Sequence, residues 1–74
     1  MIIGAHWKVY NKPGKEIDKI ENDLSDITQI EVKRTESPTS ETNFDAAFVV
    51  VGDIEPANLI DACEYMNEVG AHAV

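Results

Sequence analysis

The second half of this 74-residue chain lacks basic residues: neither Lys nor Arg occurs between Thr35 and Val74. The same stretch holds eight acidic residues, whereas residues 1–34 carry six bases and six acids. The net charge of −8 therefore comes entirely from the second half. Globular surfaces normally mix both signs. A one-sided acidic surface argues against direct nucleic-acid binding, because phosphates would be repelled, and favours a positively charged partner.

Cysteine is also scarce. The single Cys63 excludes an intramolecular disulfide, and its place in an apolar helical pattern predicts a small core residue. No apolar run approaches the length of a membrane span, and residues 1–10 lack the basic start and long apolar run of a signal peptide. We therefore expect a cytoplasmic location.

Catalytic and metal-binding motifs are missing as well. There is no Gly-rich phosphate loop, no G-x-S-x-G and no H-E-x-x-H. The soft metal ligands His6, Cys63 and His72 are far apart and lack the spacing of a zinc site. The sequence thus predicts a protein that is not an enzyme, with no catalytic residues, no metal and no cofactor.

What the chain does contain is alternating and helical apolar patterns. They predict, in order, strand 2–10, helix 15–27, strand 28–35, strand 44–52 and helix 56–69, with room for only a very short last strand at 71–74, whose pairing stays open. Asn11 to Gly14 reads as a turn, and residues 36–43 as a mobile polar loop. Pro56 is expected in the first turn of the second helix, with Asp53 or Glu55 as its cap, and Gly70 ends it.

This β-α-β-β-α-(β) order is that of the split βαβ, or ferredoxin-like, fold. The predicted class is α+β, as a ferredoxin-like domain or a truncated variant. One domain spans residues 1–74. Right-handed crossovers place both helices on one face of an antiparallel sheet, with the first and third strands in the centre. Residues 44–52 are apolar on both strand faces, which fits a central strand covered on both sides.

The sheet face opposite the helices is predicted to be apolar. Strand alternation places Trp7 in the core and the following residues on this opposite face: Gly4, His6, Tyr10, Ala47, Val49 and Val51. This set is too apolar to leave to water on a small monomer, so we expect it to form a homodimer interface. For Tyr10, core, dimer and partner contacts remain open.

Acidic residues form the most distinctive surface. Asp61, Glu64 and Glu68 fall at i, i+3 and i+7, a carboxylate stripe facing away from the buried side of the second helix. Candidate partner-binding residues are Asp18, Glu21, Asp23, Asp26, Asp53, Glu55, Asp61, Glu64 and Glu68, with Glu36 and Glu41 as secondary loop candidates. Asp23 and Asp26 lie near the negative end of their helix, where acids are disfavoured, which points to function.

Carboxylates about 5–6 Å apart on neighbouring turns resemble the interval between phosphates on a nucleic-acid strand. The sequence hypothesis is a non-catalytic DNA mimic that occupies the DNA site of a basic protein. Three other interpretations stay open. They are a well-solvated helix face, a regulatory, ligand-sensing or protein-interaction module, and an antitoxin-like neutraliser of a basic partner.

The chain is also similar to a known group of proteins in its length, its charge, its lone cysteine and its acidic segment 55–68. It resembles the small acidic host-takeover proteins of bacteriophages that act as DNA mimics, among them the phage inhibitor of the bacterial nucleoid protein HU. The resemblance implies a homodimer whose acidic face covers the DNA-binding surface of an HU-like nucleoid-associated protein, displaces DNA and disrupts the nucleoid of the infected cell.

Overall fold

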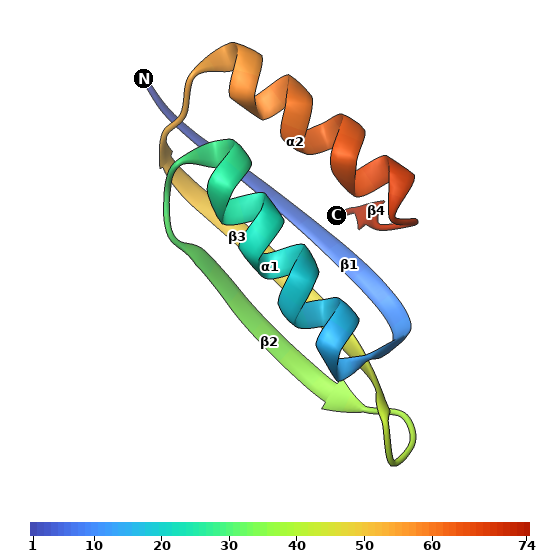
Figure 1. The fold of residues 1–74 in the computed structure, drawn as a ribbon. Helices are drawn as coiled ribbons and strands as arrows, with labels where there is room; N and C mark the ends of the chain where they lie inside the picture. The colour runs from blue at the N-terminus through green and yellow to red at the C-terminus, as the bar shows by residue number, and fades with distance from the viewer.

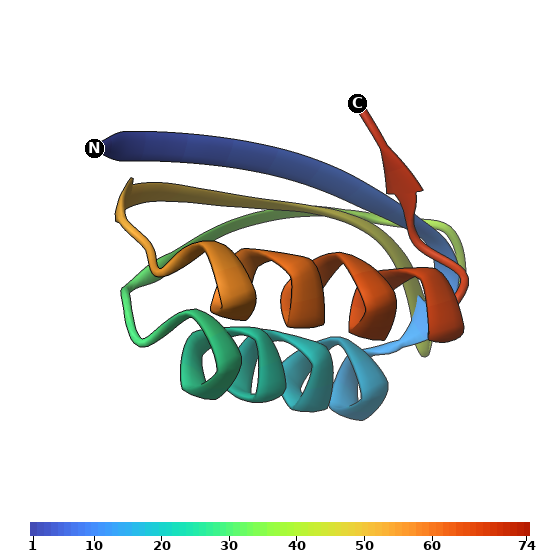
Figure 2. The same cartoon turned by 90° about the horizontal axis from the view of Figure 1, so that it is seen from above.

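The computed structural model describes all residues, 1–74, as a sheet layer and a helix layer (Figure 1). In chain order the elements are β1 (Ile2–Pro13), α1 (Gly14–Thr28), β2 (Val32–Pro38), β3 (Asn43–Asp53), α2 (Pro56–Glu68) and β4 (His72–Ala73). Figure 2 shows the two helices side by side on the same face of the sheet, with no helix over the opposite face. We refer to that uncovered side as the open sheet face.

The four strands form one antiparallel sheet in the order β2-β3-β1-β4. The long strands β1 and β3 are therefore central, as the sequence predicts. Their register pairs Trp7 with Phe48 and Ala5 with Val50. The ferredoxin-like α+β arrangement is confirmed, and the last strand, which the sequence left open, forms with only two residues.

The core lies between the sheet and the helices. Alternate residues of β1 and β3 point into it, and both helices turn their apolar stripes toward it. Its buried members are Trp7, Val9, Ile17, Ile20, Leu24, Val32, Ala46, Phe48, Val50, Ile54, Ala62 and Met66. Burying each large side chain contributes about 1.5–3 kcal/mol, so this single cluster is the main source of stability.

The turn predicted at residues 11–14 is wrong. β1 continues to Pro13 through a register shift between Val9 and Lys12, and α1 begins directly at Gly14. Asn11 adopts a left-handed backbone with φ of 54°, and its N–H donates to a carboxylate oxygen of Asp45 at 2.9 Å. Asparagine tolerates this conformation, so the extra residue becomes a bulge instead of ending the strand.

The second strand also starts later than predicted. Thr28 is the last residue of α1, and its buried hydroxyl donates to the Leu24 carbonyl at 2.8 Å. Gln29 then ends the helix with a left-handed φ of 60°. At its other end β2 runs on to Pro38 and β3 begins at Asn43, so half of the predicted mobile loop belongs to strands. Only 39–42 connect β2 to β3.

The second helix begins at Pro56 and ends before Gly70, as expected. Glu55 is the N-cap residue but makes no side-chain capping bond. Gly70 has φ of 80°, and the Ala71 N–H donates to the Met66 carbonyl at 2.9 Å, a Schellman-type ending.

The prediction that Cys63 is a core residue is wrong, because its side chain is exposed. Ala62 and Met66 alone are fully buried on α2. Cys63 lies about 100° around the helix from Ala62, away from the buried side of α2.

Candidate functional site

The outer surface of α2 carries three carboxylates. Asp61, Glu64 and Glu68 are all exposed, and none takes part in an ion pair. Their spacing places them on neighbouring turns of one helix side, away from the buried Ala62 and Met66. No Lys or Arg occurs on this helix. We call Asp61, Glu64 and Glu68 the α2 acidic face.

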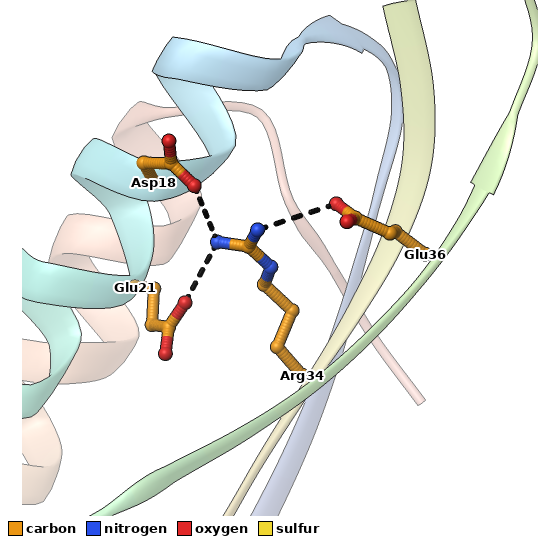
Figure 3. Close-up of polar contacts among 4 residues, drawn as sticks. All are labelled: Asp18, Glu21, Arg34 and Glu36. Carbon is orange, nitrogen blue, oxygen red and sulfur yellow. Dashed lines mark hydrogen bonds and ion pairs between the residues drawn. The ribbon is translucent and has the colours of Figure 1, made fainter.

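The carboxylates of α1 are arranged differently. Arg34 on β2 reaches across to this helix, and one of its nitrogens donates to Asp18 and to Glu21, both at 2.7 Å (Figure 3). Its other terminal nitrogen lies 3.4 Å from Glu36. Burial disfavours the guanidinium charge, but the bond to Asp18 and the charges of the other two carboxylates raise the pKa of Arg34 above its ordinary value.

Asp23 is held between the two helices. Lys19 and the hydroxyl of Tyr65 both donate to the same carboxylate oxygen, at 2.6 and 2.7 Å. These two hydrogen bonds lower the pKa of Asp23, against the weaker effect of burial. Three of the four α1 candidates are thus engaged within the molecule, and only Asp26 has no ion pair.

Asp26 extends the α2 acidic face toward α1. The helices run antiparallel in Figure 1, and Asp23 meets Tyr65. Because Asp26 is nearly one turn further along α1, it lies toward the part of α2 that precedes Tyr65, where Asp61 is found. The exposed Asp26 therefore adds a fourth unpaired carboxylate to the outside of the helix layer.

The remaining candidates lie at the ends of the sheet. Asp53 is exposed and 3.5 Å from the amino group of Met1, and Glu55 is exposed without an ion partner. Glu36 belongs to β2 instead of a loop and pairs with Arg34, which corrects its predicted setting. Glu41 is exposed in the short loop after β2.

The open sheet face brings together all six residues predicted for it. Gly4 pairs with Val51 and His6 with Val49, and these side chains share one side of the sheet. Tyr10 is 52% exposed on the same side, with its ring centroid 5.8 Å from that of His72.

The six residues predicted for this face do not include the two lysines that also lie on it. Lys8 pairs with Ala47 and Lys33 with Val49, so both belong to the open face, and neither forms an ion pair. The alternation of side chains along the strands is the sequence signal that places Lys8 and Lys33 on this face.

Two surface hollows are present. One, of about 260 Å³, lies over β3 and is lined on the open face by residues that include Lys8, Tyr10 and Asp45. The other, of about 290 Å³, lies at the start of β1 and the turn into α2. The structure brings no three His, Cys, Asp or Glu side chains together as metal ligands.

Neither helix is long and apolar enough to cross a membrane. Comparison with protein-family models, curated proteins and solved structures finds no match to this chain.

Proposed function

We propose that this protein binds a positively charged surface through its α2 acidic face and thereby acts as a non-catalytic DNA mimic. The carrying observation is that Asp61, Glu64 and Glu68 are exposed, unpaired and on a helix without a single base. In this account their carboxylates take the place of consecutive phosphates in the groove of a basic partner. The partner class is a small bacterial DNA-binding protein of the HU type, met in the cytoplasm.

The position of these acids supports a role outside the fold. Neither helix has a basic residue in its last turn, although cations there would favour the helix dipole. Glu68 is instead the last residue of α2, and Asp26 lies in the last turn of α1. Each costs the helix about 0.3–1 kcal/mol, so their placement is better explained by recognition than by stability.

The acidic candidates differ in whether their carboxylates are already bonded within the molecule. Asp18, Glu21 and Asp23 are held in ion pairs inside the molecule, at 2.6–2.7 Å. A partner would have to break these bonds to use those carboxylates. The α2 acidic face, with Asp26, needs no such rearrangement, so we assign it the primary contacts.

The ligand-sensing alternative has less support. Pockets that hold small ligands usually enclose about 300–1,000 Å³ and bury most of the ligand. The two hollows of about 260 and 290 Å³ fall below that range and lie at the surface.

A competition experiment tests the proposal. Purified HU-type protein is bound to fluorescent duplex DNA, and this protein is titrated in while anisotropy is read. The proposal predicts that the DNA is released, and that the direct affinity of the two proteins, measured without DNA, weakens as salt rises from about 50 to 200 mM, because the contacts are charge–charge. Retention of the DNA at low salt, with both proteins folded, would refute it for that partner class.

A further inference from the structure

Exposed apolar side chains gather on the open sheet face. Six large apolar side chains are exposed in the molecule, and four of them lie there: Ile2, Tyr10, Val51 and Val74, at 52–70% exposure. The half-buried Ala47 and Val49 lie between them on β3. In Figure 2 no helix lies above this side of the sheet, and only β4 and the C-terminus rise there at one end.

The register joins these residues into one continuous patch. Gly4 pairs with Val51, and His6 pairs with Val49, so β1 and β3 contribute neighbouring rows. The Val74 N–H donates to the His6 carbonyl at 2.9 Å, which sets Val74 beside His6. An apolar patch of this kind on a monomer marks an interaction site.

We propose that a second copy of this chain covers the patch, sheet against sheet, in a two-fold dimer. The area fits such a dimer. The molecule measures 40 × 20 × 20 Å, and β1 and β3 run along the length of the sheet. A 40 by 20 Å face is roughly 800 Å², which is about the area that each partner buries in a stable interface.

The composition of the two sides of the molecule favours this pairing over a head-to-tail one. The helix layer offers only one exposed large apolar side chain, Ile60, among its carboxylates. Stacking that layer on the open face would leave most of the apolar patch against charged groups. Two open faces in contact bury apolar against apolar, and a two-fold axis uses the same patch twice.

The charges on the open face suit its own copy. Lys8 and Lys33 carry the cations, and Asp45 supplies a half-buried carboxylate without an ion partner. Long lysine stems lie along apolar surface while the ammonium groups stay in water. The open sheet face thus carries positive and negative charges. A second copy can therefore place opposite charges against them.

The dimer would direct its two helix layers outward, on opposite sides. Each α2 acidic face then stays accessible, so the assembly presents two partner-binding surfaces. This inference concerns a different surface from the proposed function and stands without it.

Sedimentation equilibrium of the full chain, from micromolar to millimolar concentration, tests the dimer. The test variant is Val51→Lys, and the matched control is Ile60→Lys, since these side chains are 63% and 59% exposed. The wild type is expected to reach twice its 8.2 kDa mass. Val51→Lys is expected to raise the dimer dissociation constant at least tenfold, and Ile60→Lys to change it less than threefold.

Circular dichroism melting checks that each variant is folded, and Ile2→Lys, at the start of β1, serves as a second variant should Val51→Lys not fold. A wild-type mass of 8.2 kDa throughout would overturn the dimer. So would equal effects of the open-face and α2 variants, or assemblies that keep growing with concentration, as a head-to-tail contact would produce.

Discussion

The hydroxyl of Tyr65 on α2 donates a 2.7 Å hydrogen bond to the carboxylate of Asp23 on α1. The residues are 42 positions apart in the chain. Lys19 donates to the same oxygen at 2.6 Å, so the carboxylate is fixed between a cation and a phenol. This contact ties the helices together and removes Asp23 from the acidic residues that a partner can use.

Substitution Tyr65→Phe removes the hydrogen bond while keeping the ring. We expect the free energy of unfolding to fall by about 1–2 kcal/mol, because a bond to a charged acceptor is lost and Asp23 keeps only Lys19. Urea denaturation of both proteins measures the difference. An unchanged unfolding midpoint and slope would show that the bond does not hold the helices together.

The same contact predicts a loss of stability at high pH. Burial, together with the Asp23 carboxylate, raises the pKa of Tyr65 well above its ordinary value. The folded protein thus holds this proton more tightly than the unfolded chain, where the pKa is about 10. The resulting stability is complete below about pH 10 and is lost as the pH rises toward the folded pKa.

Urea unfolding between pH 8 and 11 tests this, with Tyr65→Phe as the reference. The difference in unfolding free energy between the two proteins is expected to shrink above about pH 10. Deprotonation of lysines affects both proteins and cancels. A difference that stays constant from pH 8 to 11 would contradict the raised pKa of the Tyr65 hydroxyl in the folded protein.

Arg34 makes a second group of contacts inside the molecule, since it bonds to Asp18 and Glu21 and approaches Glu36. We call this group the Arg34 clamp. Substitution Arg34→Met leaves three carboxylates without their shared cation. We expect a loss of about 1–2 kcal/mol in unfolding free energy, partly recovered in high salt, because the remaining charges repel.

The control is Lys15→Met, which removes the same charge from an exposed residue of α1, away from the open sheet face. Lys15 has no ion pair, so its loss is expected to change stability by less than about 0.5 kcal/mol. Equal destabilisation by the two substitutions would mean that net charge, and not the Arg34 clamp, sets the effect.

Much of the fold could be predicted because it depends on local patterns. Alternation placed Trp7 in the core, and both faces of β3 were recognised as apolar. Gly70 was identified as the end of α2 because a left-handed residue is needed there. The bulge at Asn11 was missed because its residues read equally well as a turn.

Features that depend on how the elements pack were not predictable. The position of Cys63 is set by how α2 lies on the sheet, with Ala62 and Met66 turned inward and Cys63 outside the core. Arg34 is 16 and 13 residues from the carboxylates that it binds, so no helix pattern identifies them as paired. Sequence reasoning therefore assigned one role to Asp18, Glu21, Asp23 and Asp26, and the structure separates Asp26 from the other three.

The most direct test of the DNA-mimic account is the affinity of a purified HU-type protein for a triple variant of the α2 acidic face. Asp61→Asn, Glu64→Gln and Glu68→Gln are combined, and binding is measured by titration calorimetry at fixed salt. The control combines Glu16→Gln, Glu31→Gln and Asp45→Asn, the three acidic residues outside the candidate partner-binding set, which changes the net charge equally.

The account predicts at least tenfold weaker binding of the α2 variant, about 1.4 kcal/mol, and less than threefold weakening of the control. Circular dichroism confirms that both remain folded. Unchanged affinity of a folded α2 variant, or equal weakening of the two, would contradict the assignment of the partner site to Asp61, Glu64 and Glu68.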